Sequence, residues 1–174
     1  MKGTRAGDLM IPLSDYPHMP YWFTLRQAMA TLRGSRIEVD GKVSLPRAFL
    51  VFNEAYELLG VVRRRDILRG LEPRFLEGKG PSFPRKLFDV KADPDLLELG
   101  DGALASRVRE RAERPVAEVM QPIKVTLDHD AHLMRVIYEM VENDLSMIPV
   151  LRDGSVVGVV RSVDVLDAVS ALVL

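Results

Sequence analysis

The nine residues GVVRRRDIL at positions 60–68 return almost unchanged as GVVRSVDVL at positions 158–166. Six of the nine positions are identical, and each copy joins a short apolar run to a segment with an aspartate. The apolar run predicts the end of a strand, and the aspartate predicts the first turn of a helix. A repeat of this kind within 174 residues indicates a fold built from two copies of one unit.

The similarity extends toward the N-terminal side of both stretches. AGDLMIP at 6–12 corresponds to VAEVMQP at 116–122, and TLRQAMATL at 24–32 corresponds to HLMRVIYEM at 132–140. Each copy therefore predicts a short strand, a helix, a two-stranded unit and a final helix. Because so small a unit does not readily bury both its sheet and its helices alone, we expect the two copies to pack together.

The first copy carries an additional segment. Met10 and Asp66 lie 56 positions apart, whereas the equivalent Met120 and Asp164 lie 44 positions apart. Most of the extra residues fall in RGSRIEVDGKVSLP at about 33–46. Alternating side chains on both sides of an Asp-Gly pair predict that this insert forms a small hairpin.

Composition narrows the class of protein. Hydrophobic residues make up 47% of the chain and charged residues 28%, which is typical of a globular domain with a real core. The net charge of −1 gives no general attraction to nucleic acid or to an anionic membrane. Without cysteine, disulfides and thiolate chemistry are excluded. The N-terminus has no signal-peptide pattern and no apolar run is long enough to span a membrane, so we expect a cytoplasmic protein.

The duplicated Gly-apolar-apolar-x-x-x-Asp stretch, the two Met-x-Pro segments and the helices in register resemble a tandem pair of cystathionine-β-synthase-type (CBS) domains, or Bateman module. The resemblance covers residues 5–71 and 114–174, separated by a linker with helical segments at 72–113. It implies an α+β fold in which two pseudo-symmetric β-α-β-β-α repeats pack through their sheets. It also implies a regulatory, non-catalytic protein, often a homodimer, with clefts for AMP, ADP, ATP or S-adenosylmethionine.

In this family the aspartate of the repeated stretch accepts hydrogen bonds from both ribose hydroxyls of the ligand. The resemblance carries that role to Asp66 and Asp164. An ionised carboxylate has two oxygens that can accept both hydroxyls, and the helix dipole favours an anion in the first turn. The alternative is that each aspartate only stabilises the start of its helix.

The chain departs from the family three residues before each aspartate. The usual Thr or Ser near the phosphates is replaced by Arg63 and Arg161. A guanidinium at a helix N-terminus is disfavoured by about 0.3–1 kcal/mol, unless an anion also binds there. The two arginines, with Arg64 and Ser162 beside them, therefore predict either phosphate binding through bidentate contacts or a degenerate site with solvated side chains.

The base of a nucleotide would lie between strand edges, where apolar walls and free backbone donors suit a purine. The alternative for Phe49, Leu50 and Ile148 is ordinary core packing. By register with the family, the base contacts would be Val125, Thr126, Ile148 and Pro149 in the second copy and Phe49 and Leu50 in the first.

Other chemistries find little support in the sequence. His129 and His132 are three apart beside carboxylates, but the first copy has no counterpart, so we predict no metal site. We also identify no nucleophile–base set and no phosphate-binding loop of the GxxxxGK[ST] type. The leading hypothesis is a sensor that requires no cofactor and binds an adenosine-containing nucleotide for a regulated protein partner. The alternative is a ligand-free dimerisation or interaction scaffold with a degenerate site.

Overall fold

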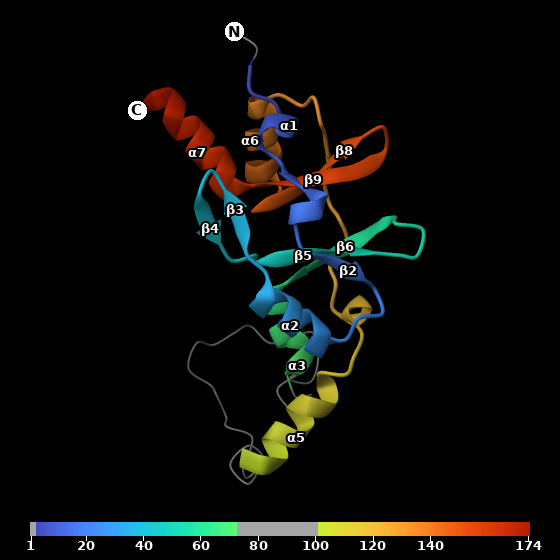
Figure 1. Cartoon of the computed structure of the whole chain (residues 1–174). Helices are drawn as coiled ribbons and strands as arrows, with labels where there is room; N and C mark the ends of the chain where they lie inside the picture. The colour runs from blue at the N-terminus through green and yellow to red at the C-terminus, as the bar shows by residue number, and fades with distance from the viewer. Residues whose placement is uncertain (1–2, 73–100) are drawn as a thin grey trace, which may run out of the picture.

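The computed structural model describes residues 3–72 and 101–174. It has four layers, with two sheets facing each other at the centre and a pair of helices outside each sheet (Figure 1). The helices and strands mix within each repeat, and the two repeats meet through their sheets. The predicted α+β architecture is therefore confirmed.

The sheet of the second repeat has the strand order β1-β9-β8-β7, with β7 parallel to β8 and the other neighbours antiparallel. Helices α6 (Leu133–Glu142) and α7 (Ser162–Val173) lie on its outer side (Figure 1). The strands are β1 (Ile11–Pro12), β7 (Leu127–Asp128), β8 (Met147–Arg152) and β9 (Ser155–Arg161).

The sheet of the first repeat has the order β2-β5-β6, with β2 parallel to β5 and β5 antiparallel to β6. Helices α2 (Leu25–Gly34) and α3 (Arg64–Leu71) lie on its outer side. The strands are β2 (His18–Pro20), β5 (Ala48–Phe52) and β6 (Leu58–Arg63).

The extra segment of the first repeat contains an antiparallel hairpin, β3 (Ile37–Val39) and β4 (Lys42–Ser44). Asp40 and Gly41 at its turn both have positive φ, 49° and 75°, as a two-residue hairpin turn requires. The remaining elements are α1 (Ala6–Leu9), the 3₁₀ turns η1 (Leu13–Asp15) and η3 (Val116–Glu118), and α5 (Asp101–Arg111).

Three apolar cores stabilise these layers. One lies in each repeat between its sheet and its helices. The third joins side chains from both sheets and from the hairpin, so the two repeats share a continuous interior. Its buried members are Ile11, Tyr16, Ile37, Leu50, Phe52 and Val159.

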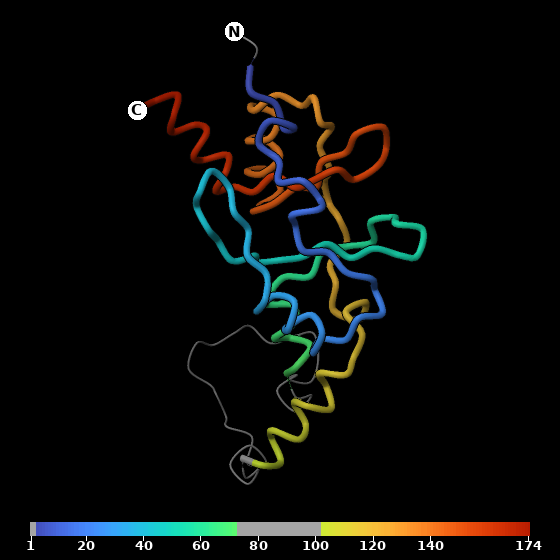
Figure 2. Tube along the Cα trace, in the orientation of Figure 1, coloured from blue at the N-terminus to red at the C-terminus, as the bar shows by residue number. Residues whose placement is uncertain are grey.

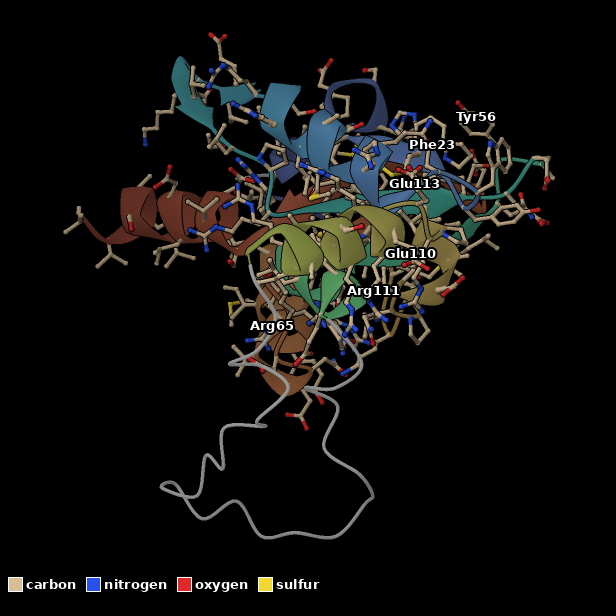
Figure 3. The ribbon with its side chains drawn as sticks, turned by 90° about the horizontal axis from the view of Figure 1, so that it is seen from below. Phe23, Tyr56, Arg65, Glu110, Arg111 and Glu113 are labelled. Carbon is tan, nitrogen blue, oxygen red and sulfur yellow. The ribbon has the colours of Figure 1, made fainter. Side chains whose placement is uncertain are left out.

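Helix α5 is tied at its C-terminal end to the helices of the first repeat. Arg26 Nε lies 2.5 Å from Glu113 Oε1, and the backbone N–H of Leu25 donates to Arg114 O at 2.9 Å. Arg111 Nε donates to Gly70 O at 3.0 Å. Figure 3 views this end of the molecule, with Arg111 and Glu113 near the end of α5. Neither α5 nor any other helix of the described residues is long and apolar enough to cross a bilayer.

The first residues of each repeat pack on the other repeat. We call residues 5–12 and 115–122 the lead-in segments. The first runs beside α6 of the second repeat, far from it in sequence (Figure 2). Within it, the N–H of Ala6 donates to Ala131 O and the N–H of Gly7 to His129 O, both at 2.8 Å.

The second lead-in segment makes the reciprocal contact with the first repeat. The N–H of Val116 donates to Phe23 O at 2.7 Å, and the N–H of Ala117 donates to Tyr21 O at 3.2 Å. Val116 and Val119 are buried in the core of the first repeat. Each core is thus completed by the first residues of the other repeat.

The glycines of the repeated stretch allow this exchange. A Cβ on Gly158 would lie 2.5 Å from Ile11 O, and a Cβ on Gly60 would lie 2.6 Å from Gln121 O. Both distances are shorter than real Cβ contacts, and the obstructing atom is backbone in each case. The Met-x-Pro segment of each repeat therefore contacts the repeated glycine of the other repeat, so the same contact occurs twice in the molecule.

We expect Gly158→Ala to lower the free energy of unfolding by about 1–3 kcal/mol, because the added methyl group must push the first lead-in segment away. Urea denaturation checks this. Gly34→Ala is the matched control, since a Cβ there meets nothing within 4 Å and should leave stability unchanged or slightly raised. Equal urea midpoints for Gly158→Ala and the unaltered protein would contradict the close approach.

Candidate functional site

Two clefts lie between the repeats. The first has a volume of about 410 Å³ and is lined by Ser44 of the hairpin, Arg47 before β5 and Arg64 at the start of α3. Arg161 and Ser162, at the start of α7, form part of its other wall. Residues from both repeats therefore line one space.

The second cleft has a volume of about 660 Å³. Arg63 and Arg65 line it from the first repeat, and Lys124, Val125 and Pro149 line it from the second. The start of a helix from one repeat thus faces strand residues from the other. This is the pseudo-symmetric counterpart of the first cleft.

A common wall separates the two clefts and makes both of them basic. Arg47 and Arg64 line both spaces. Among the described residues, the lining of the first cleft includes three arginines and no acid. That of the second includes four arginines and a lysine against one aspartate, Asp144. Positive charge is therefore concentrated between the repeats of a chain whose net charge is −1.

Several of these cations lack a protein partner. Arg64 Nη2 donates to Pro46 O at 2.9 Å, which fixes its side chain against the first repeat. Within residues 3–72 and 101–174, the side chains of Arg47, Arg65 and Lys124 form no hydrogen bond or ion pair. These three charges are free to pair with an anion that enters the clefts.

The aspartate of the first repeat is closed off by arginines. Asp66 has no exposed side-chain surface. Its Oδ2 accepts from the N–H and the Nε of Arg63, both at 2.9 Å, while Oδ1 accepts from Arg63 Nη2 at 3.1 Å and from Arg69. Burial raises the pKa of the Asp66 carboxyl, but the hydrogen bonds and charges of Arg63 and Arg69 outweigh it and lower the pKa below 3.8. Asp66 is thus ionised and fully engaged.

The aspartate of the second repeat is held by one arginine. Arg161 Nε and Nη2 donate to the two carboxylate oxygens of Asp164, each at 2.7 Å. The third guanidinium nitrogen, Nη1, donates to Ser44 Oγ at 2.8 Å. The exposed fractions of the Arg161 and Asp164 side chains are 14% and 11%. Arg161, at the position where the family usually has Thr or Ser, therefore binds the aspartate three residues after it.

The predicted site residues do not all line the same cleft. Val125 and Pro149 lie in the second cleft with Arg63 and Arg64, not beside Asp164. Asp164 lines neither cleft but an adjacent hollow of about 610 Å³, formed with the first lead-in segment and the hairpin. Phe49, Leu50 and Ile148 have no exposed surface and belong to the cores, and Thr126 is exposed outside both clefts.

Sequence reasoning missed Arg47, Ser44 and Lys124. The signal for Arg47 was present, because the match of RAFLVF at 47–52 with SMIPVL at 146–151 makes it the counterpart of Ser146. Both residues line the two clefts. Nothing in the sequence placed Ser44 near Arg161, since that contact depends on how the hairpin folds against α7.

The predicted absence of a metal site can be compared with the placement of the histidines. His132 is the residue that precedes α6, and His129 lies against Gly7 of the first lead-in segment. In the described part of the chain, no three His, Cys, Asp or Glu side chains are grouped so that they could hold a metal ion.

Comparison with known proteins identifies this arrangement. A family model for the CBS domain matches residues 116–171. The second repeat therefore matches the CBS domain, and the fold of the whole chain is similar to that of CBS-domain structures. Among curated proteins, no sequence matches the chain.

Solved structures share the CBS-pair fold over nearly the whole chain. CBSX2 in complex with AMP is 17% identical with a TM-score of 0.63, covering 99% of this chain and 100% of that one. A CBS domain-containing protein of unknown function from Bacillus anthracis is 18% identical with a TM-score of 0.64, covering 97% and 94%. The cytosolic domain of the Mg²⁺ channel MgtE in complex with ATP is 23% identical with a TM-score of 0.58, covering 97% and 49%.

The engagement of Asp66 predicts a pH-dependent contribution to stability. We expect Asp66→Asn to lower the free energy of unfolding by about 1–3 kcal/mol at pH 7, because a buried acceptor of charged hydrogen bonds is lost. The folded-state pKa lies below the ordinary 3.8, so the contribution is complete above that pH and disappears as the pH falls through the folded-state pKa. Urea denaturation at pH 7 and pH 3 should show the gap between variant and unaltered protein shrinking.

Asp8→Asn is the matched control for this measurement. Asp8 also accepts from the N–H of the residue before its helix, Arg5, at 2.9 Å, but it is exposed. We expect a smaller loss at pH 7. An equal loss for both variants would mean that the arginine pairing of Asp66 adds nothing beyond ordinary helix capping.

Proposed function

We propose that this CBS pair is a regulatory module that binds an adenosine-containing nucleotide between its repeats. The observation that carries the proposal is the pair of basic clefts lined by both repeats, with Arg47, Arg65 and Lys124 unpaired in the described structure. Unpaired cations facing a shared concave space are the features that recognise phosphate.

The dimensions of the clefts and the starts of the helices support this proposal. Volumes of about 410 and 660 Å³ fall within the range of small-molecule sites. The starts of α3 and α7 line the clefts, and a helix N-terminus favours an anion. The structures of CBSX2 with AMP and of the MgtE domain with ATP add support from the same fold.

The proposed pose follows from the charges. Phosphates lie against Arg47 and Arg64 on the common wall, and the base lies near Val125 and Pro149 in the second cleft. That base position belongs to a ligand of the second cleft, where Asp66 is held by two arginines and is closed to a ribose. In a ligand of the first cleft, Asp164 is the candidate for the ribose hydroxyls once Arg161, its one arginine partner, leaves it.

The regulatory effect would arise from contacts with both repeats. A ligand between them stabilises the arrangement that it fits best, and a protein partner would respond to that arrangement. The proposal includes no catalysis and no required cofactor. A cytoplasmic location remains a prediction from the sequence.

We expect AMP, ADP or ATP at millimolar concentration to raise the melting temperature of the protein, since a ligand of the folded state stabilises it by mass action. Arg47→Gln should weaken binding of the best nucleotide by about tenfold or more, because one charge-assisted hydrogen bond is lost. Isothermal titration calorimetry measures the affinity.

Arg33→Gln is the control, since Arg33 is an exposed arginine near the end of α2 that lines neither cleft. It should bind the nucleotide as the unaltered protein does. Absence of any melting shift with all three nucleotides and with S-adenosylmethionine would count against ligand sensing.

One observation favours the scaffold as a second candidate function. Both signature aspartates are bound by arginines of the chain itself, as a protein that has lost its ligand would show. The helices of the second repeat also expose several large apolar side chains, a feature of association surfaces. These are Met134, Tyr138 and Val141 on α6 and Val163, Leu166 and Leu172 on α7.

We propose that these side chains form the contact of a homodimer, whichever candidate function holds. Leu166→Glu should then shift the mass measured by sedimentation or light scattering from dimer toward monomer, because a charge enters an apolar interface. Leu68→Glu is the control, since Leu68 is the first-repeat counterpart of Leu166 and is 68% exposed on a helix with little other apolar surface. Dissociation by Leu68→Glu alone would place the contact on the first repeat instead.

A further inference from the structure

Arg161 connects three parts of the molecule. It lines the first cleft, holds both oxygens of Asp164, and reaches Ser44 on β4 of the hairpin. All of its guanidinium nitrogens are therefore in use. These contacts use three of the five guanidinium N–H groups, one on each nitrogen. A phosphate that pairs bidentately with Nε and Nη2 must displace Asp164, and one that takes the N–H bound to Ser44 Oγ must displace the hairpin.

In the described part of the chain, Arg161 lies between the first cleft and Asp164, the ribose-binding candidate. Arg161 lines the first cleft and Asp164 does not, so a molecule in the cleft meets the guanidinium before the carboxylate. The hollow that Asp164 does line also contains Asp8, Asp15, Glu38 and Asp40. Their negative charges oppose the approach of a nucleotide from that side.

The equivalent pair in the first repeat has no such connection. Arg63 bonds to Asp66 alone within the described residues, and Asp66 is held additionally by Arg69. Opening that carboxylate would require two arginines to leave a buried acid. The second repeat is thus the one in which a single side chain controls access.

The hairpin depends on the same arginine for part of its docking. Besides the bond to Ser44, it is held by an exposed ion pair, Lys42 Nζ to Asp167 Oδ2 at 2.9 Å, and by the buried side chain of Ile37. Figure 1 shows β3 and β4 standing across the sheets toward α7. Exposed ion pairs contribute little, so loss of the Arg161 contact would leave mainly the apolar packing of Ile37 and Val39 to hold the hairpin.

We propose that Arg161 acts as a latch on the first cleft. A phosphate must displace Arg161 from Asp164 before the ribose of a nucleotide can bind, and the same displacement releases the hairpin. This inference rests on the proposed function. A phosphate in the first cleft takes the guanidinium, which frees Asp164 for the ribose hydroxyls and breaks the bond to Ser44. A nucleoside has no group that can displace the arginine, so it meets a carboxylate that is already paired. The hairpin, loosened from α7, becomes the element that reports ligand binding.

The test compares adenosine with AMP, ADP and ATP by calorimetry on the full chain. The unaltered protein should bind at least one nucleotide about tenfold or more tightly than adenosine. Arg161→Ala should bind adenosine about tenfold more tightly than the unaltered protein, because Asp164 is then open. If Arg161 were only a phosphate ligand, its removal would leave adenosine binding unchanged.

Hydrogen exchange of the hairpin amides gives a second readout. The bound nucleotide should speed exchange across residues 37–44 in the unaltered protein. Ser44→Ala keeps the Arg161–Asp164 pair and serves if Arg161→Ala does not fold. In Ser44→Ala the hairpin should exchange faster without ligand, and the nucleotide should add little.

The outcomes separate the two proposals. Nucleotide binding with unchanged adenosine affinity in Arg161→Ala, or with no change in hairpin exchange, would overturn the latch and leave the proposed function standing. Failure of every nucleotide to bind the unaltered protein would overturn both.

Discussion

The fold depends on a close contact between a backbone carbonyl of one repeat and a glycine of the other, made at two equivalent places. At Gly60 and Gly158 the backbone of a lead-in segment lies where a side chain would otherwise be. Each contact places the first residues of one repeat in the apolar core of the other. Neither repeat therefore has a complete core of its own. We infer that the two repeats fold and unfold as one unit, although the sequence divides cleanly between them.

This exchange also explains why each cleft is built from both repeats. Because the lead-in segments cross, Lys124 and Val125, which follow the second, face the start of α3, while Tyr16, which follows the first, lies in the first cleft with the start of α7. A ligand in either space touches both halves of the molecule. Small changes in how the repeats sit thus alter the site, which is the physical requirement for a module that senses a ligand.

The sequence predicted the repeat and its elements, because these follow from periodicity and from a duplicated motif. The α+β class and the packing through the sheets came from the resemblance to the CBS family. The sequence also predicted the hairpin, through an Asp-Gly turn between alternating residues. It did not predict the partner of Arg161, since the contact with Ser44 joins residues 117 positions apart and depends on the exact docking of the hairpin. The family register placed Val125 and Pro149 in the second copy but did not say which helix start they would face, since that depends on how the two repeats dock.

The replacement of a hydroxyl by arginine changes what an unliganded CBS cleft must do. A hydroxyl leaves the signature aspartate free, whereas the guanidinium of Arg161 satisfies both of its oxygens within the folded chain. The Arg161 guanidinium, which a phosphate would bind, therefore stabilises the unliganded state. In the proposed function, ligand binding would exchange one ion pair for another, so the gain from the new pair would be offset by the loss of the old one. Such an exchange would favour reversible binding over very tight binding, and the hairpin on the first repeat would make the two clefts respond differently despite the twofold repeat of the sequence.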